Sequence, residues 1–231
     1  MNITNASQLN RLSAYRVLLY AKPGTGKTSA IKALPGKTLL LDLDHSSKVL
    51  AGAENIDVIF ADRNDPQKFM TDFLKWWGQN YTAYQNLVVD NVSAFEKDWF
   101  IWMGKTSYNQ ISNQLEHYGA WTNYFLRVIT ALYATPVNVV VTAWERTRTV
   151  TLSDGQILTE YVPDVRDQVL NTFMGLTDVV GRMMVNPETG GRGVIMAGND
   201  GMFAKNRLDG RTVCKAADLF NFEGTNHVLP A

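Results

Sequence analysis

Five continuous apolar runs constrain the fold of this chain more than any other feature. They occupy residues 15–21, 37–44, 56–62, 86–90 and 137–143. An apolar run without polar alternation is typical of a strand that is buried on both faces, and such strands occur in parallel sheets covered by helices. Because helical patterns alternate with these runs, we predict an α/β fold with a mostly parallel sheet flanked by helices.

Three segments between the runs carry helical signals. Residues 28–34 follow the first run and stop at a Pro-Gly pair. Asp65-Pro66 supplies an N-cap and a proline at the first helical position, and aromatic residues follow at helical spacing. Residues 120–134 repeat apolar side chains every three or four positions, which predicts an amphipathic helix leading into the fifth run.

The last third of the chain has a different pattern. Residues 146–162 alternate polar and apolar side chains around Asp154-Gly155, which predicts a β-hairpin. Residues 178–198 predict a second antiparallel pair. We therefore expect antiparallel strands to extend the C-terminal end of the parallel sheet.

Length, charge and cysteine content narrow the protein class. The 231 residues suit a single domain spanning 1–231, in which residues 1–14 form an N-terminal extension that could act as an oligomerisation arm. The lone Cys214 excludes an internal disulfide framework and a cysteine-based zinc site. No apolar stretch is long enough to span a membrane, and the N-terminus lacks the core of a signal peptide, so we expect a cytoplasmic protein. With 22 basic and 22 acidic residues, any nucleic-acid binding must come from a local patch or from patches aligned across several subunits.

Residues 21–28, "AKPGTGKT", fit the phosphate-loop pattern G-x-x-x-x-G-K-[ST], with Ala21 in place of the first glycine. The pattern predicts that Lys27 reaches the β- and γ-phosphates of ATP and that the Thr28 hydroxyl ligates Mg²⁺, with the following helix adding its dipole. The alternative is a Gly/Pro turn with a surface lysine. The expected nucleotide-binding set is Pro23, Gly24, Thr25, Gly26, Lys27, Thr28 and Ser29.

Acidic residues end two of the apolar runs. Asp90 closes "NLVVD" as a Walker-B aspartate does, and we expect it to hold Mg²⁺; the alternative is an N-cap for the next helix. Asp44 is the candidate general base if its strand neighbours the phosphate-loop strand, and the alternative is a solvated loop acid. We expect Asp42 to face the other way and to be structural, and His45 to make only a local polar contact.

The order of these motifs resembles that of the RecA-like recombinase and helicase ATPases. "LLLDLDH" is similar to a run in bacterial recombinases whose second acid is the catalytic glutamate, which implies a catalytic role for Asp44. "FAKNRLDG" resembles the K-x-R element through which ring and filament ATPases reach the γ-phosphate bound by a neighbouring subunit. That likeness implies a homo-oligomer in which Lys205 and Arg207 act in trans. From residue 15 to 219 the chain looks most like the small phage RecA-like nucleotide-binding proteins, which include ATP-dependent single-strand annealing proteins.

The resemblance also implies two loops that face single-stranded DNA. One spans residues 104–119 and the other 144–166. In them we expect cations to contact phosphates and aromatic rings to stack on bases. The candidates are Lys105, Tyr108, Arg146, Arg148 and Tyr161. The alternative for the second loop is a solvent-facing hairpin with incidental arginines. Glu145, by position, could sense the γ-phosphate.

Together these features predict an ATPase that uses ATP and Mg²⁺, binds single-stranded DNA as an oligomer and promotes annealing or recombination. A single-strand-binding protein is a further candidate partner, and the host cytoplasm is the expected location if the chain is phage-encoded. Two alternatives share the phosphate loop. One is a phosphotransferase resembling a nucleoside monophosphate kinase, which would need an arginine-rich lid, and the other is a helicase or packaging-type DNA motor.

Overall fold

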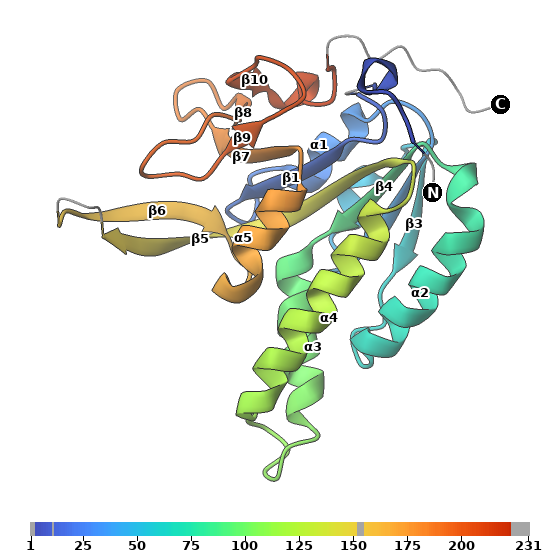
Figure 1. The fold of residues 1–231 in the computed structure, drawn as a ribbon, viewed down its shortest axis with the longest axis vertical. Helices are drawn as coiled ribbons and strands as arrows, with labels where there is room; N and C mark the ends of the chain where they lie inside the picture. The colour runs from blue at the N-terminus through green and yellow to red at the C-terminus, as the bar shows by residue number, and fades with distance from the viewer. Residues whose placement is uncertain (1–2, 11, 152–154, 223–231) are drawn as a thin grey trace.

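A twisted sheet of ten strands forms the central layer of the computed structural model, which describes residues 3–10, 12–151 and 155–222 (Figure 1). The strand order is β10-β8-β7-β1-β5-β4-β2-β3, with β6 paired to β5 and β9 to β7. The strands are β1 (Arg16–Ala21), β2 (Thr38–Asp42), β3 (Ile56–Phe60), β4 (Asn86–Asp90), β5 (Asn138–Thr151), β6 (Ile157–Pro163), β7 (Val179–Val185), β8 (Arg192–Ile195), β9 (Lys205–Asn206) and β10 (Val213–Lys215).

The parallel part of the sheet follows the apolar runs, as predicted. Strands β1, β2 and β4 are buried along their whole length, and all three pair only in parallel. In the centre, Leu18 of β1 lies between Val141 of β5 and Val180 of β7. The antiparallel pair predicted for residues 178–198 is confirmed as β7 and β8, and β7 also pairs in parallel with β1 on its other side. The change from parallel to antiparallel pairing therefore occurs at β7 itself.

Helices cover both faces of the sheet. They are α1 (Lys27–Ala30), α2 (Pro66–Asn80), α3 (Val92–Gly104), α4 (Leu115–Tyr133) and α5 (Asp167–Leu176). One buried cluster joins α2–α5 to Leu18 and Tyr20, and the other joins the α1 region and the C-terminal segment to Val17 and Leu19. Alternate side chains of β1 thus enter opposite cores. Among the helices of the described residues, none combines the length and apolar composition that a membrane crossing requires.

Local capping explains where two predicted helices begin. The Asp65 side chain accepts a hydrogen bond from the Lys68 amide at 3.0 Å, and Pro66 occupies the first position of α2, as predicted. Helix α4 begins at Leu115, earlier than the predicted 120, where Gln114 and His117 form a reciprocal capping box. Helix α5 was not predicted, although its buried residues Val169, Leu170, Phe173 and Met174 have helical spacing.

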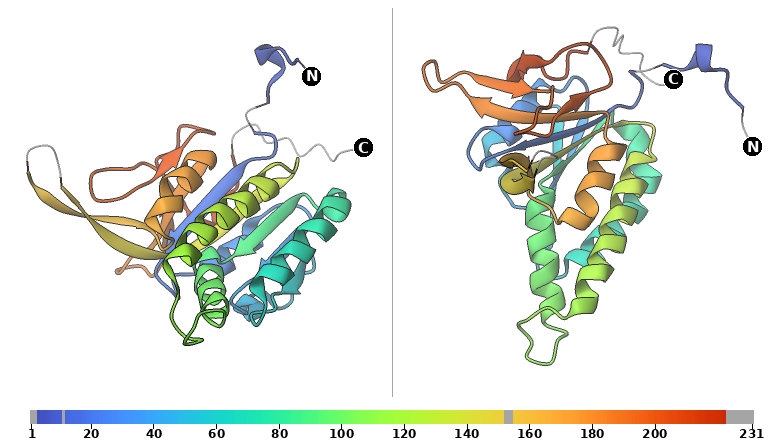
Figure 2. Two further views of the ribbon diagram at one scale, coloured as in Figure 1. Left: turned by 60° about the horizontal axis from the view of Figure 1, so that its bottom comes forward. Right: turned by 60° about the vertical axis from the view of Figure 1, so that its left-hand side comes forward.

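The predicted hairpin is confirmed, and its first strand is the far half of the long strand β5. Strand β5 leaves the core after Ala143, alternates in burial, and pairs with β6 to form an arm that projects from the body (Figure 1). Asp154 of the predicted turn lies outside the described residues. The first described residues also leave the body, where Ala6–Gln8 forms one 3-10 turn (Figure 2). The role of this extension as an oligomerisation arm stays a prediction.

A buried arginine fixes the start of β1 against the end of α4. The Arg16 side chain is 9% exposed and donates hydrogen bonds to the carbonyl oxygens of Thr135 at 2.7 Å and Val137 at 2.8 Å, and to that of Tyr133. Its backbone amide donates to the Asp178 carboxylate at 2.8 Å. These contacts set the height of β1 in the sheet, and therefore the position of the loop that follows it.

Candidate nucleotide-binding site

The phosphate-loop hydroxyl and the Walker-B carboxylate meet at the carboxyl edge of the sheet. Thr28 Oγ1 donates a hydrogen bond to Asp90 Oδ2 at 2.6 Å, and Thr142 of β5 donates to Asp90 Oδ1. Strand β5 lies between β1 and β4, so Thr142 fills the gap between the two motifs. The predicted N-cap alternative for Asp90 is wrong, because Asn91 caps α3 by accepting from the Ala94 amide at 2.8 Å.

The phosphate loop has the backbone that the motif requires. Gly24 and Gly26 have φ values of 78° and 107°, which disfavour any residue with a Cβ. The Lys27 ammonium group folds back onto the loop and donates to the carbonyl oxygens of Ala21 at 3.0 Å and Lys22 at 3.3 Å. Helix α1 has only four residues and continues as a 3-10 turn, so its dipole is weaker than we expected. Amide groups and the lysine must therefore do most of the phosphate binding.

Burial disfavours the charged forms of both Lys27 and Asp90. Burial lowers the pKa of Lys27, and the nearby carboxylates of Asp90, Asp44 and Glu145 oppose that shift. It raises the pKa of Asp90, against the hydrogen bonds from Thr142 and Thr28. The site thus holds a carboxylate and an ammonium group at reduced solvation, where phosphate and a divalent cation can replace the lost water.

The donor set fits Mg²⁺. Asp90 and Thr28 offer a carboxylate and a hydroxyl oxygen, which are hard ligands, and Mg²⁺ commonly binds through one or two protein oxygens together with substrate phosphates. Across the described ranges of the chain, no group of three or more His, Cys, Asp or Glu residues could hold a metal ion. These residues therefore suit a cation shared with a nucleotide.

Asp44 joins the site through a loop. Strand β2 does not neighbour β1, because β4 and β5 lie between them, so the adjacency on which we placed this residue is wrong. Asp44 nevertheless reaches the carboxyl edge beyond β2, where its Oδ2 accepts a hydrogen bond from Asn91 and its Oδ1 accepts one from the Ser46 amide at 3.1 Å. Asn91 follows Asp90 directly, so Asp44 is held next to the Walker-B residue. Its role as a general base stays a prediction.

Asp42 and His45 make local contacts. The fully buried Asp42 carboxylate accepts hydrogen bonds from the amides of Ser46 at 3.1 Å and Ser47 at 3.0 Å. This is the structural position that we expected, but alternation is not its reason, because residues two apart on a strand share a face. The chain instead turns after Asp42, and His45 adopts a φ of 60° with Nε2 at 2.8 Å from the Ala61 carbonyl oxygen.

Glu145 is held by Arg182, an arginine that belongs to none of the predicted motifs. Arg182 of β7 donates to Glu145 Oε2 at 2.6 Å and to Oε1 at 3.2 Å, and its guanidinium carbon lies 3.6 Å from the centroid of the Tyr161 ring. Ala143, two residues before Glu145, and Arg182 both lie opposite Tyr20 of β1. The ion pair therefore spans the end of the phosphate-loop strand. In the sequence, the one indication of this ion pair is a basic residue, Arg182, within the otherwise apolar segment that forms β7.

The side chains of Lys205 and Arg207 contact the segment just before β7, whereas the phosphate loop follows the carboxyl end of β1. Strand β9 pairs with the first residues of β7, where Lys205 lies opposite Val180. Lys205 Nζ and Arg207 Nη1 both donate to the Gly175 carbonyl oxygen, at 3.2 Å and 3.3 Å. Their predicted common orientation is confirmed. Burial, together with the charge of Arg207, lowers the pKa of Lys205 to about 8.

The candidate DNA-contact residues fall into separate places. Exposed Lys105 and fully exposed Tyr108 follow α3 at the tip that leads to α4, far from the β5–β6 arm (Figures 1 and 2). On the arm, Arg146 pairs with Asp167 at 2.5 Å and Arg148 pairs with Glu160 at 2.6 Å. Tyr161 lies opposite Thr147 in the strand register, on the other face from these arginines, and is covered by Arg182. The structure does not bring the five residues together.

Comparison with known proteins gives a family match. A family model described as an AAA domain matches residues 13–208, which include the phosphate loop, Asp90 and the Lys205–Arg207 pair. Among solved structures, the chain is similar to a KaiC-like protein from the hyperthermophilic archaeon Pyrococcus horikoshii OT3, with 13% sequence identity, a TM-score of 0.46, and coverage of 79% of this chain and 78% of that chain. No curated protein matches the chain.

Two buried aspartates allow a matched test of the site. We expect Asp90→Asn to weaken Mg²⁺-dependent ATP binding by about tenfold or more, because it removes the charge that would hold the cation. It should not lower the melting temperature, since burial already disfavours that charge. Binding of a fluorescent ATP analogue with and without Mg²⁺ measures the first effect, and thermal unfolding measures the second.

Asp42→Asn is the control. It should lower the free energy of unfolding by about 1–3 kcal/mol, because a backbone amide loses its charged acceptor, and it should leave ATP binding unchanged. Equal effects of the two substitutions on Mg²⁺-dependent binding would contradict the assignment of Asp90.

Proposed function

The chain belongs to the AAA domain family, and from that premise we propose that it is a P-loop ATPase whose site is completed by a neighbouring copy and whose oligomer binds single-stranded DNA. The proposed role is annealing or recombination of the phage RecA-like type. The observation that supports it is the separation of two groups of residues. The phosphate loop follows the carboxyl end of β1, whereas the side chains of Lys205 and Arg207 contact the Gly175 carbonyl oxygen just before β7.

At the carboxyl edge, the chain offers groups that would bind the phosphates and Mg²⁺ of Mg²⁺·ATP. The backbone N–H groups of residues 24–26 would surround the phosphates, and Lys27 would exchange its two carbonyl acceptors for phosphate oxygens. Thr28 and Asp90 would hold Mg²⁺, which when bound neutralises phosphate charge. Asp44, oriented by Asn91, would accept a proton from the attacking water.

Near the start of β7, the positive side chains of Lys205 and Arg207 share one backbone acceptor, the Gly175 carbonyl oxygen. Within the described part of the chain, neither forms an ion pair, and their acceptor is a backbone carbonyl oxygen. Cations that reach a transferred phosphoryl group stabilise the charge that develops on it. Because both side chains are held on the Gly175 carbonyl oxygen and not on the phosphate loop of their own chain, the proposed recipient is a head-to-tail neighbour.

The α3–α4 tip supports the DNA part of the proposal best. The Tyr108 ring is fully exposed, so it can stack on a base, and Lys105 lies three residues away to contact a phosphate. Arg146 and Arg148 would first have to leave their carboxylate partners. Since the formal charge of one subunit is zero, binding would depend on repeated tips along an oligomer.

Electron microscopy of the protein with single-stranded DNA, Mg²⁺ and a non-hydrolysable ATP analogue tests the proposal directly. We expect regular oligomers that require both DNA and nucleotide, and a mobility shift of a labelled oligonucleotide. Tyr108→Ala should weaken the shift, whereas Tyr118→Ala, within the same candidate loop, serves as its control because that ring packs against Phe100. A protein that hydrolyses ATP but neither assembles nor binds DNA would overturn the DNA role alone.

Substitution of Lys205 and Arg207 tests catalysis in trans. We expect Lys205→Ala and Arg207→Ala each to reduce ATP hydrolysis by about a thousandfold or more while ATP binding is retained, because the lost charge acts on the transferred phosphoryl group. Exposed Lys75→Ala is the control. Mixing inactive Lys205→Ala with inactive Lys27→Ala should restore hydrolysis, since one variant keeps the loop and the other keeps the cations. Failure of the mixture to recover activity would argue against a shared site.

The pKa of Lys205 gives this role a pH signature. Below about pH 8 the ammonium group is charged, and as the pH rises through about 8 it loses the charge that the neighbour would need. We therefore expect kcat/KM for ATP, which reports the free enzyme, to fall above pH 8. Lys205→Arg should keep its charge and show a flatter alkaline limb in a steady-state pH profile. An identical decline in both proteins would assign the titration to another group.

A further inference from the structure

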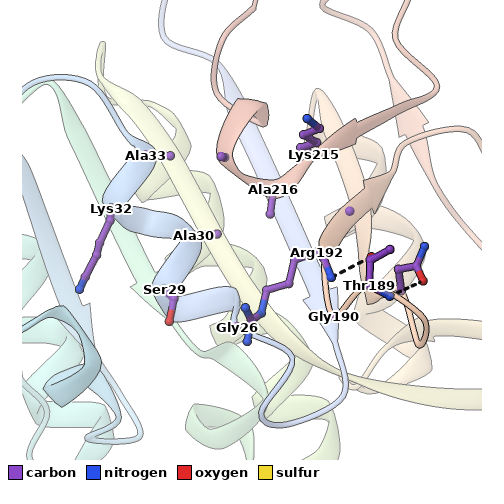
Figure 3. Close-up of a pocket in the computed structure, with 14 residues that line it drawn as sticks. Gly26, Ser29, Ala30, Lys32, Ala33, Thr189, Gly190, Arg192, Lys215 and Ala216 are labelled. Carbon is purple, nitrogen blue, oxygen red and sulfur yellow. Dashed lines mark hydrogen bonds between the residues drawn. The ribbon is translucent and has the colours of Figure 1, made fainter.

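A cavity of about 810 Å³ lies beside the phosphate loop, between α1 and the turn that joins β7 to β8 (Figure 3). One wall is formed by Gly26, Ser29 and Ala33, on α1 and the 3-10 turn after it, and the opposite wall by the glycine-rich residues 189–193. Ala216 and its neighbours close the far side. This volume is within the range of small-molecule sites.

The lining favours an anionic ligand with a flat apolar part. Alanine and glycine make up most of it, so the walls are smooth and leave room for a planar ring. Arg192 and Lys215 contribute positive charge, whereas the Lys32 ammonium group points away from the turn at residues 189–193 (Figure 3), and the described residues that line the cavity include no aspartate or glutamate. Thr189 and Asn186 add polar groups on the turn side.

Arg192 stands at the boundary between the cavity and the phosphate loop. It extends from β8 toward Gly26, and its Nε donates a hydrogen bond to the Thr25 carbonyl oxygen at 2.8 Å (Figure 3). A Cβ atom added at Gly26 would lie 2.6 Å from that Nε, so the arginine occupies the space directly over this glycine. Within the described ranges, the two Nη atoms of Arg192 have no hydrogen-bond or ion-pair partner.

We propose that this cavity is the subsite for the base and ribose of the nucleotide, and that Arg192 is a binding residue that joins it to the phosphate loop. This inference rests on the proposed function. The Nη groups donate to the phosphate nearest the ribose, while Nε stays on Thr25 and holds the loop in its binding conformation. A planar guanidinium group can serve both acceptors at once, whereas a lysine offers a single point of charge.

The place of the cavity supports this assignment over an unrelated anion site. Gly26 and Ser29 belong to the predicted nucleotide-binding set and also line the cavity. A triphosphate held by the loop would therefore have its nucleoside end directed along α1, between the helix and the turn at residues 189–193. The C-terminal third of the chain then supplies the base subsite that the phosphate-loop motif lacks.

The test compares two probes with Mg²⁺, namely ATP and inorganic tripolyphosphate, by isothermal titration calorimetry. Ala33→Leu and Ala217→Leu narrow the cavity from opposite sides, and Ala217 is exposed, so its substitution leaves the core intact. We expect each to weaken ATP binding by about tenfold and to leave tripolyphosphate binding unchanged. Ala131→Leu, an exposed alanine on α4, is the matched control.

Arg192→Ala should weaken the binding of both probes by about tenfold, because the lost contact is to a phosphate, and Arg192→Lys should recover only part of it. Exposed Arg127→Ala on α4 is the control. Thermal unfolding verifies that every variant is folded. Cavity variants that bind ATP as the wild type does, or that weaken both probes equally, would overturn this inference alone. A wild-type protein that binds neither probe would overturn the nucleotide function and this inference with it.

Discussion

The buried carboxylate of Asp90 is the interaction on which the rest of the site depends. Its two oxygens accept hydrogen bonds from hydroxyl groups on two other elements, Thr28 of the phosphate loop and Thr142 of β5. That geometry is available only because β5 lies between β1 and β4 and leaves all three carboxyl ends at one level. The surroundings of this carboxylate depend on the strand order and on the position in which Arg16 holds β1. They also depend on the loop that carries Asp44, which contacts the neighbouring Asn91.

Much of the fold could be predicted from the sequence because burial on two faces leaves a direct trace in it. The runs that became β1, β2 and β4 are apolar in their centres, so the positions and class of these strands could be predicted. The order of the strands in the sheet could not be predicted, because packing across the sheet, and not the local sequence pattern, determines which strands pair. The double pairing of β7 and the continuity of β5 from core to arm are consequences of that packing.

The site divides in the same way. The loop at residues 21–28 and the acid at the end of β4 are local motifs, and local sequence was sufficient to place them. Arg182 and Arg192 approach from the last quarter of the chain, and no spacing in the sequence connects either of them to Glu145 or Thr25. Tyr161 has a suitable ring in a suitable segment, but strand register turns it away from the arginines of the arm. Register and distant approach are tertiary properties.

The proposed sharing of a site between subunits would give an assembly a direction, because the phosphate loop and the Lys205–Arg207 pair lie in different places on the sheet. In an open row of subunits, one terminal copy keeps a phosphate loop that no neighbour completes, and the copy at the other end keeps unused cations. Such a row contains one complete site fewer than it has subunits, whereas in a closed ring every subunit would have a complete site. The bare loop at one end would retain its nucleotide longer than the interior sites, so the two ends of a row would differ in stability. Growth and loss of subunits would then be polar, even though every copy is identical.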